Sequence, residues 1–271
     1  MVQATAGMAP TKRKDKLPSD DELEKQIIAA SKQQVKPYEE KAVASSLMDG
    51  SLSAGKIVSE TKNDKLGTTN LSLSNGVTIT VKPTTFKNDE ILMDCWRWGG
   101  WQRFPLEDKD NAKHAAELVS MMGVKDMSPT DLQKFLSGKT VDVMPYINDH
   151  EEGIQGSSST KDFETFLQLV NLYFTRPRKD QALFNSYVAK QKGQLQFLKS
   201  NPKYFFQDTL YKIAYNNSPW VRFLPSSTEF ENLTLDKIMA DYDTIFSNAD
   251  GMHFTFVGNV DLSNAKPLFE K

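Results

Sequence analysis

The sequence predicts an α+β fold: a mostly antiparallel sheet with helices packed on one face, preceded by a helical linker. Two observations favour it, because the predicted strands group into hairpins and the predicted helices come in runs. A third is the absence of alternating βαβ units, which disfavours a doubly wound nucleotide-binding fold. The expected order in the compact part is β-β-β-α-α-β-β-α-α-α-α-β. At 271 residues, the chain is long enough for one large domain with an extension.

The chain is expected to contain three parts. Residues 1–18 are polar, carry a basic run and are expected to form a disordered lead-in. Residues 19–65 are expected to form a helical linker, because Ser19 and Glu22 have the spacing of a capping box and a turn-rich stretch follows. Residues 66–271 are expected to hold the α+β domain.

The compact domain is predicted to open with a hairpin in "TTNLSLSNGVTITVKP". Apolar residues alternate on both sides of Asn75-Gly76, and Asn-Gly suits a type I′ turn, which needs positive φ at both central positions. The stretch "EILMDCWRWGG" is a predicted third strand, because its apolar residues alternate and a glycine pair ends it.

Helices dominate the remainder of the predicted order. "AKHAAELVSMMG" (112–123) ends at a glycine, and "SPTDLQKFLSG" begins with a Ser-Pro cap. "KTVDVMPYIN" and "EEGIQGSSST" are predicted to pair as strands around an Asn-Asp turn. Further elements are helices at about 160–174, 179–199, 203–215 and 234–247, the strand "MHFTFVGNV", and a helix that starts at Leu262.

Charge and cysteine content limit the function classes. Lys and Arg total 33 against 35 Asp and Glu, a net charge of −2, which argues against nucleic acid or an anionic membrane as the main partner. No apolar run approaches the roughly 18 residues that a membrane helix needs. Cys95 is the only cysteine, so neither an intrachain disulfide nor a thiolate zinc cluster is expected.

The two ends of the sequence favour an excerpt from a longer protein. No apolar signal-peptide core stands at the N-terminus, and the chain ends at Lys271 just as a predicted helix begins. The alternative is a cytosolic protein. Localisation is therefore left unknown, with the periplasm or cell envelope expected if the parent carries a signal peptide.

The helix 112–123 holds a candidate metal site. His114 and Glu117 stand where the zinc motif H-x-x-E-H has its first ligand and its base, but the second ligand position is Leu118, which has no donor atom. His150 and His253 are isolated in the sequence. The favoured interpretation is an amphipathic core helix, and no metal is expected in this chain.

Three tryptophans flank the glycine pair of "CWRWGGW". Trp96, Trp98 and Trp101 are a candidate contact surface, since tryptophan is enriched among interface anchors. The alternative is an ordinary strand end whose turn needs glycine. No nucleotide-binding loop of the G-x-G-x-x-G or G-x₄-G-K-[ST] type occurs. "SSST" is expected to be a helix cap rather than a nucleophile, and "DHEEG" a solvated turn rather than a cation site.

From Leu71 onward, the order of motifs resembles the pitrilysin/insulinase family of zinc peptidases, which carry the inverted H-x-x-E-H motif. The matching stretches are "LSLSNGVTITVKP", the Gly-Gly pair, "HAAELVSMMG", "LSGKTVDVMPYIND", "GSSSTKDFETFLQLVNLYFTRPRKD" and "FTFVGNVD". The stretch "PYEEKAVASSLMDGSLSAGKIVSE" is similar to the linker before the third domain of long bacterial members.

The resemblance implies a site that has lost its metal. Family members are built from repeated α+β units arranged as two halves around a peptide chamber, and one unit carries the zinc. By resemblance, His114 matches the first ligand, Glu117 the base and Leu118 the second ligand. Counting back from the Asn-Pro pair places the third ligand, a glutamate in the family, at Gly193 or Gln194. Neither is a carboxylate, so this unit is expected to be non-catalytic.

The expected function is therefore that of a non-catalytic domain of a larger zinc metalloendopeptidase, taken from the C-terminal half of a long bacterial member. It would form part of the chamber wall and pack against the catalytic half, which would hold the zinc. Its expected partners are the other domains and the peptide substrate. The alternative is a stand-alone interaction module, or an inactive partner subunit of a separate peptidase.

Overall fold

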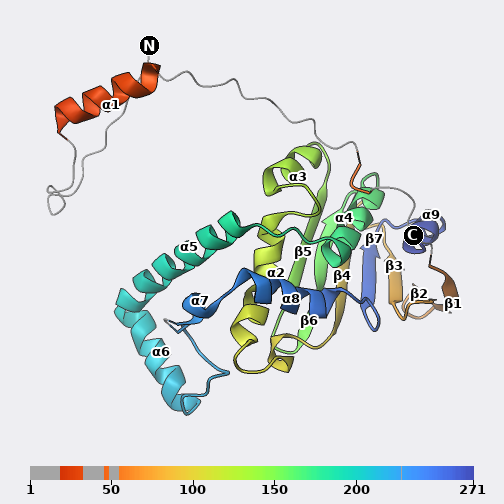
Figure 1. The fold of residues 1–271 in the computed structure, drawn as a ribbon. Coiled ribbons are helices and arrows are strands. Elements are labelled where there is room, and N and C mark those ends of the chain that lie inside the picture. The colour runs from red at the N-terminus through yellow and green to blue at the C-terminus, as the bar shows by residue number, and fades with distance from the viewer. Residues whose placement is uncertain (1–18, 33–45, 49–54, 227) are drawn as a thin grey trace. The chain divides into compact units, whose positions relative to one another are not determined.

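The computed structural model describes most of the chain and divides it into two compact units, Met1–Ala42 and Val43–Lys271 (Figure 1). The described residues are 19–32, 46–48, 55–226 and 228–271. The predicted lead-in 1–18 lies outside them, as does most of the predicted linker between its first helix and residue 55.

The first unit contributes one described helix, α1 (Asp20–Lys32). The predicted capping box is present, because the backbone N–H of Ser19 donates to Glu22 at 2.9 Å and that of Glu22 donates to the Ser19 hydroxyl at 3.4 Å. Acidic residues in the first turn and Lys32 in the last complement the helix dipole. All described residues of α1 are exposed, including Leu23 and Ile27.

The second unit is built on a seven-stranded sheet with the order β1-β2-β3-β7-β4-β6-β5. Its strands are β1 (Ile57–Asn63), β2 (Thr68–Leu73), β3 (Thr78–Pro83), β4 (Ile91–Trp98), β5 (Val141–Ile147), β6 (Glu151–Ser158) and β7 (His253–Gly258). Neighbouring strands are antiparallel except β3 and β7, which are parallel. The predicted α+β class with a mostly antiparallel sheet is confirmed.

One strand lies inside the stretch that the sequence assigned to the linker. β1 pairs with β2 in antiparallel register, with Glu60 opposite Leu71. Its residues are exposed or half-buried throughout, because it is an edge strand with one neighbour. An edge strand of this kind has no apolar alternation, which is the signal that sequence reading depends on.

The β2–β3 hairpin forms where the sequence predicted it, but its turn is not of type I′. Gly76 has a φ of +84°, whereas Asn75 is not among the positive-φ residues. The Gly76 N–H donates to Leu73 O at 3.2 Å, and the Leu73 N–H donates to Val77 O at 2.8 Å. This is the pattern of the longer hairpin loop, in which a left-handed glycine follows an ordinary turn.

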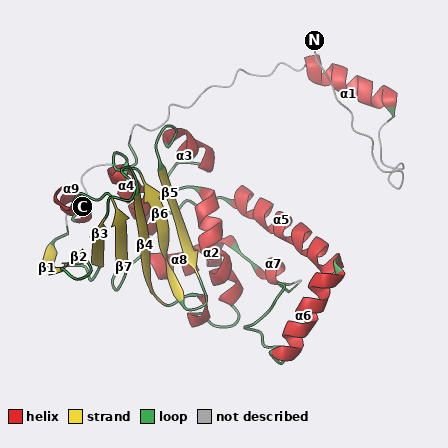
Figure 2. Ribbon diagram, turned by 180° about the vertical axis from the view of Figure 1, so that it is seen from behind, coloured by secondary structure: helices red, strands yellow, loops and turns green. Residues whose placement is uncertain are grey.

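The described helices of the second unit are α2 (Lys109–Met122), α3 (Pro129–Phe135), α4 (Phe163–Thr175), α5 (Gln181–Ser200), α6 (Pro202–Ala214), α7 (Glu229–Asn232), α8 (Leu235–Phe246) and α9 (Leu262–Phe269), with the short 3-10 helix η2 (Trp101–Arg103). Helices α2, α4 and α8 cover one face of the sheet (Figures 1 and 2). Figure 1 shows α2, α4 and α8 in front of the strands, and the reverse view in Figure 2 shows the strands uncovered. No described helix has both the length and the apolar character needed to cross a membrane.

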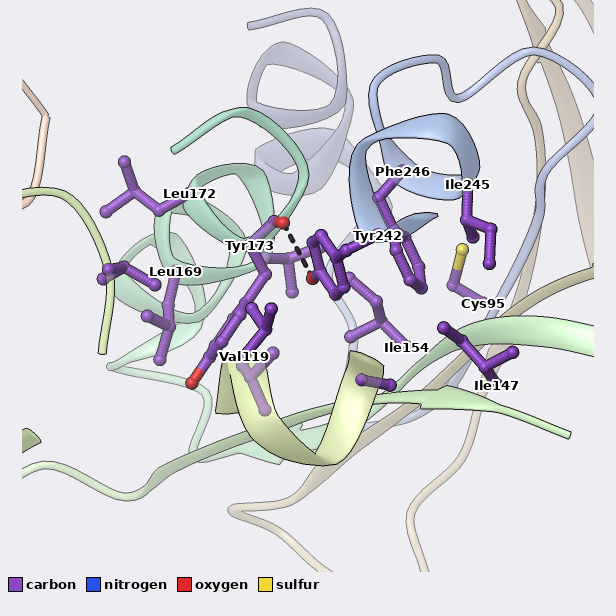
Figure 3. Packing of buried hydrophobic residues seen from close by; sticks show 14 of the residues in the cluster. Cys95, Val119, Ile147, Ile154, Leu169, Leu172, Tyr173, Tyr242, Ile245 and Phe246 are labelled. Atoms are coloured by element: carbon purple, nitrogen blue, oxygen red, sulfur yellow. Dashed lines mark hydrogen bonds between the residues drawn. The ribbon is translucent and has the colours of Figure 1, made fainter. Parts of the chain in front are cut away.

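The core lies between the sheet and these three helices (Figure 3). Cys95 and Ile154 point from the sheet toward Val119 of α2 and Phe246 of α8, and all four side chains are buried. The hydroxyl of Tyr242, which is itself fully buried, donates to Tyr173 O at 2.9 Å. This bond ties α8 to α4 over the sheet and fixes how α2 is seated beside them.

Candidate functional site

Helix α2 carries His114, Glu117 and Leu118, the residues that the sequence resemblance compares with the zinc motif, and it is amphipathic. Its buried face includes Ala115, Leu118, Val119 and Met122, which pack into the core. Leu118 is fully buried, so the side chain at the second ligand position is enclosed by apolar neighbours. Replacing those contacts with a polar side chain costs free energy unless a hydrogen-bond partner is supplied.

His114 is buried at the edge of that face and both of its ring nitrogens are engaged. Nδ1 lies 2.9 Å from the hydroxyl oxygen of Tyr187 on α5. Nε2 lies 3.0 Å from Oε1 of Glu229 on α7. The ring of Phe230 packs against the imidazole with centroids 5.3 Å apart. The side chain thus joins three helices that lie far apart in the sequence.

Glu229 is a buried carboxylate held by positive charge. Burial by itself would raise the pKa of Glu229, but the hydrogen bond from His114 and the nearby charge of Lys113 lower that pKa to about 2. The Lys113 ammonium lies 3.5 Å from the same carboxylate oxygen as His114. Glu229 is therefore ionised at neutral pH, with the Lys113 ammonium as its charged partner and His114 as its hydrogen-bond partner.

The hydrogen-bond pattern leaves neither ring nitrogen of His114 free. Tyr187 donates its hydroxyl proton to Glu117 Oε2 at 2.7 Å, and the same hydroxyl lies against His114 Nδ1. The Glu229 carboxylate accepts from Nε2–H, since an ionised carboxylate has no proton to give. Both nitrogens are therefore engaged by side chains of other helices.

These residues do not fit zinc. A metal ligand needs a free ring nitrogen, and both nitrogens of His114 are engaged by Tyr187 and Glu229. Glu117, the base position, is occupied by the Tyr187 hydroxyl, and Leu118 offers no donor atom. Within the described part of the chain, no group of three or more His, Cys, Asp or Glu residues is arranged to hold a metal ion.

The predicted third ligand position lies apart from this cluster. Gln194 is exposed on α5, and Gly193 beside it faces open space. The α5 residue that reaches Glu117 is Tyr187, and a helix rises about 1.5 Å per residue, so Gln194 lies about 10 Å further along the axis. The structure thus brings His114 and Glu117 together but leaves Gln194 outside.

Sequence reasoning missed the two residues that complete the cluster. Tyr187 and Glu229 stand 73 and 115 positions beyond His114. Glu229 lies on a four-residue helix that carries no apolar periodicity. No local spacing signal connects either residue to α2, so only the fold reveals the contact.

The three tryptophans do not form one surface. Trp96 and Trp98 pack edge to face with centroids 5.3 Å apart, and Trp98 is 72% exposed. Trp101 is only 7% exposed and stacks on Trp220 at 6.3 Å. The contact-surface hypothesis therefore applies to the Trp96–Trp98 pair, whereas Trp101 belongs to the core of the domain.

The glycine pair makes room for a buried carboxylate rather than for a nucleotide. Glu152 is fully buried and accepts from Arg97 Nε at 2.8 Å, Arg103 at 3.0 Å and the Gly100 N–H at 2.9 Å. A Cβ at Gly99 would meet the Glu152 carboxylate at 2.5 Å. The two arginines also donate to carbonyls at the end of α8, so this cluster ties the sheet to that helix.

A cavity of about 920 Å³ lies elsewhere in the second unit, between the sheet and α4. Its walls include the aromatic rings of Phe174, Phe246, Phe254, Phe256 and Phe269. Residues of the His114 cluster do not line it. Glu164, Glu270 and Lys271 also line it. The Lys271 ammonium lies 3.5 Å from the Glu164 carboxylate, and Glu270 accepts from the Ile57 N–H at 2.9 Å. The cavity thus offers a mainly aromatic binding volume whose charged groups already have partners.

Comparison with known proteins identifies related sequences. No family model matches the chain. A zinc protease PQQL-like protein of Arabidopsis thaliana is 22% identical over 237 residues, which is 86% of this chain and 22% of that protein. The probable zinc protease PqqL of Escherichia coli K12 is 24% identical over 195 residues, which is 71% of this chain and 20% of that protein.

Solved structures share the fold. The periplasmic protease PqqL from E. coli superposes with a TM-score of 0.74 at 20% identity, covering 94% of this chain and 28% of its own. The ferredoxin protease FusC, solved with Arabidopsis ferredoxin, gives 0.73 at 15% identity with the same coverages. The first half of PqqL, solved separately, gives 0.60 at 13% identity over 78% of this chain and 46% of its own.

The chain thus spans about a fifth of the length of the curated relatives that it matches. Its likeness to a zinc protease covers the described sheet and helices, but the residues at the motif positions are tied into a hydrogen-bonded pair and an apolar core.

Proposed function

We propose that this chain, which belongs to the pitrilysin/insulinase-type family of zinc peptidases, is a non-catalytic domain of a larger zinc metallopeptidase. The observation that carries the proposal is the state of His114. Its two ring nitrogens are engaged by Tyr187 and Glu229, so the residue at the first ligand position has no free nitrogen for a metal ion.

The comparisons support a place in the second half of the parent. The whole E. coli protein gives a TM-score of 0.74 over 94% of this chain, whereas its first half alone gives 0.60 over 78%. The better match therefore includes residues beyond that first half. This favours the third unit of a long bacterial member, with the linker that precedes it.

In the parent, this domain would form part of the wall of the peptide chamber and pack against the catalytic half. The catalytic unit would hold the zinc that activates water, and this chain would supply rigid surface. The tie from Arg97 and Arg103 through Glu152 to α8 supports a rigid wall element. The periplasmic location of the E. coli relative supports the same compartment for a bacterial parent.

The test compares this chain with its parent. The purified 271-residue chain should bind no stoichiometric zinc and show no chelator-sensitive peptide cleavage. The parent should do both, and His114→Ala together with Glu117→Ala should leave its zinc content unchanged. Alanine at the first histidine of an upstream H-x-x-E-H motif is the matched control and should remove the zinc.

Two outcomes would contradict the proposal. Stoichiometric zinc with chelator-sensitive cleavage by the chain alone would make this unit catalytic. A reading frame without an upstream H-x-x-E-H motif would favour the second candidate, an inactive partner subunit of a separate peptidase.

A further inference from the structure

Helices α5 and α6 form an arm that extends away from the sheet, and the long helix α5 leads into α6 at Asn201-Pro202 (Figures 1 and 2). The Asn201 side chain caps α6 by accepting from the Lys203 N–H at 3.0 Å. Asp208 is the only buried residue of α6. The arm is therefore a well-formed helix pair of which α6 is almost wholly exposed.

One face of α6 already has a partner within the domain. The rings of Tyr204 and Tyr211 pack against Phe223, with centroids 6.3 and 5.4 Å away. Asp208 accepts from the Leu224 N–H at 3.3 Å. The loop after α6 thus covers this face and holds the helix in place.

The opposite face carries an apolar stripe without a partner among the described residues. Phe206, Leu210 and Ile213 are 66%, 52% and 74% exposed. They are spaced by four and three residues, so they lie along one side of the helix. This spacing is that of a helix–helix seam, in which successive apolar side chains insert between those of a facing helix.

Exposed apolar side chains concentrate on this arm. Of the eighteen large apolar side chains that are exposed in the described structure, seven lie between Phe197 and Tyr215. Tyr211 is one of the seven and packs on Phe223, whereas Phe206, Leu210 and Ile213 share the uncovered side of α6. Scattered single apolar residues on a surface need no explanation, but several on one helix face mark an interaction surface.

The arm is also basic. Residues 181–214 contain five lysines and one aspartate, a net charge of +4, whereas the whole chain carries −2. Lys203 stands three positions before Phe206, so it lies on the same side of α6 as the stripe. Asp208 is bound to Lys212 at 2.6 Å on the covered side. A partner that binds the stripe should therefore carry acidic residues beside its apolar contact residues.

We propose that the Phe206–Leu210–Ile213 stripe docks an acidic amphipathic helix from another domain of the parent polypeptide. This inference rests on the proposed function, because the chain spans about a fifth of its relatives and leaves most of the parent to supply the partner. The spacing of the stripe fits a helix, and the surrounding lysines select an acidic one. Nucleic acid is disfavoured, since aliphatic Leu210 and Ile213 offer no ring on which a base can stack.

Cysteine accessibility tests the docking directly. Leu210→Cys is introduced into the 271-residue chain and into the full-length parent, and its maleimide labelling is followed by peptide mass spectrometry. The natural Cys95 is fully buried and does not interfere with the assignment. Labelling in the parent should be at least about tenfold slower than in the chain, because the docked state must open before the thiol reacts. In the full-length parent that carries Leu210→Cys, adding Lys203→Glu or raising the salt concentration should restore the fast labelling rate of the isolated chain.

Phe86→Cys is the matched control, since Phe86 is the most exposed large apolar side chain described and lies outside the arm. It should label at similar rates in chain and parent. Equal rates for Leu210→Cys in both proteins, or equal slowing of both cysteines, would overturn the docking. The docking would also be overturned if Leu210→Cys in the 271-residue chain alone were labelled more slowly at higher chain concentration or with added single-stranded DNA. A second copy of the chain, or nucleic acid, would then cover the stripe.

The docking and the proposed function fail in different ways. A parent with chelator-sensitive peptidase activity and an unprotected Leu210→Cys would remove the docking and leave the proposed function intact. A chain that binds zinc and cleaves peptides by itself would remove the proposed function, whatever the labelling rates.

Discussion

His114 and Glu229, 115 residues apart in the sequence, meet as a buried hydrogen-bonded pair with Nε2 3.0 Å from Oε1. The other ring nitrogen, Nδ1, lies 2.9 Å from the Tyr187 hydroxyl. His114 therefore has a structural role in which both of its ring nitrogens link α2 to other helices.

Restoring the second ligand should not restore metal binding. Leu118→His places an imidazole in the core, where it should lower the free energy of unfolding by about 2–5 kcal/mol, the range for disrupting a buried leucine. Zinc titration calorimetry should detect no tight site. Adding Gln194→Glu should not change this, because Gln194 is exposed and both ring nitrogens of His114 stay bound to Tyr187 and Glu229. Tight zinc binding by Leu118→His alone would contradict the assigned partners of His114 and the placement of the third ligand.

Acid should release the His114–Glu229 pair. The folded pKa of Glu229 is about 2, below its usual value of 4.5, so its carboxylate stabilises the fold above pH 4.5 and loses this effect as the pH falls toward 2. Glu229→Gln should lower the free energy of unfolding at pH 7 by about 2–3 kcal/mol and flatten its pH dependence between those limits. Urea unfolding at several pH values measures both effects.

Glu231→Gln is the control for that experiment, because Glu231 is exposed on the same short helix. It should change stability little at any pH. An unchanged pH profile for Glu229→Gln would show that His114 and Lys113 do not lower the pKa of the Glu229 carboxylate.

Asp241 on α8 should affect the pH dependence of stability in the opposite direction to Glu229. Burial and the nearby Asp108 carboxylate raise its pKa to about 6, and Lys237 opposes them only partly. A raised folded pKa favours the fold below pH 3.8, and that effect disappears as the pH rises through 6. Asp241→Asn should therefore raise the free energy of unfolding at pH 7 by about 1 kcal/mol after allowance for solvent screening, and leave it unchanged at pH 3. Lower stability at pH 7 would contradict this account.

Two glycines should respond oppositely to alanine. Gly99→Ala forces a methyl group to within 2.5 Å of the buried Glu152 carboxylate, so it should destabilise the fold by about 1–3 kcal/mol. Gly193→Ala meets no atom and lies inside helix α5, where alanine is favoured by about 1 kcal/mol. Thermal unfolding of the pair measures the difference. Equal changes in stability for the two variants would show that Gly99 and the Glu152 carboxylate lie further apart in solution than in this structure.

Local pattern predicted most elements and none of the cluster around His114. The β2–β3 hairpin and α2 carry their own turn and periodicity signals, so both appear near the expected residues. β1 lacks that signal because it is a polar edge strand, and α7 is too short to show a period. The partners of His114 depend on how α5 and α7 pack, which single-sequence spacing does not encode.

Strand β7 occupies a special place in the order of synthesis. Among the described strands it alone joins β1-β2-β3 to β4-β6-β5, yet it is made of residues near the C-terminal end, His253–Gly258. A nascent chain that has emerged only as far as α8 therefore holds two sheet fragments with open inner edges. Such edges are sites of mispairing with other chains. The sheet therefore closes only after β7 has been synthesised, and not when the early hairpins form.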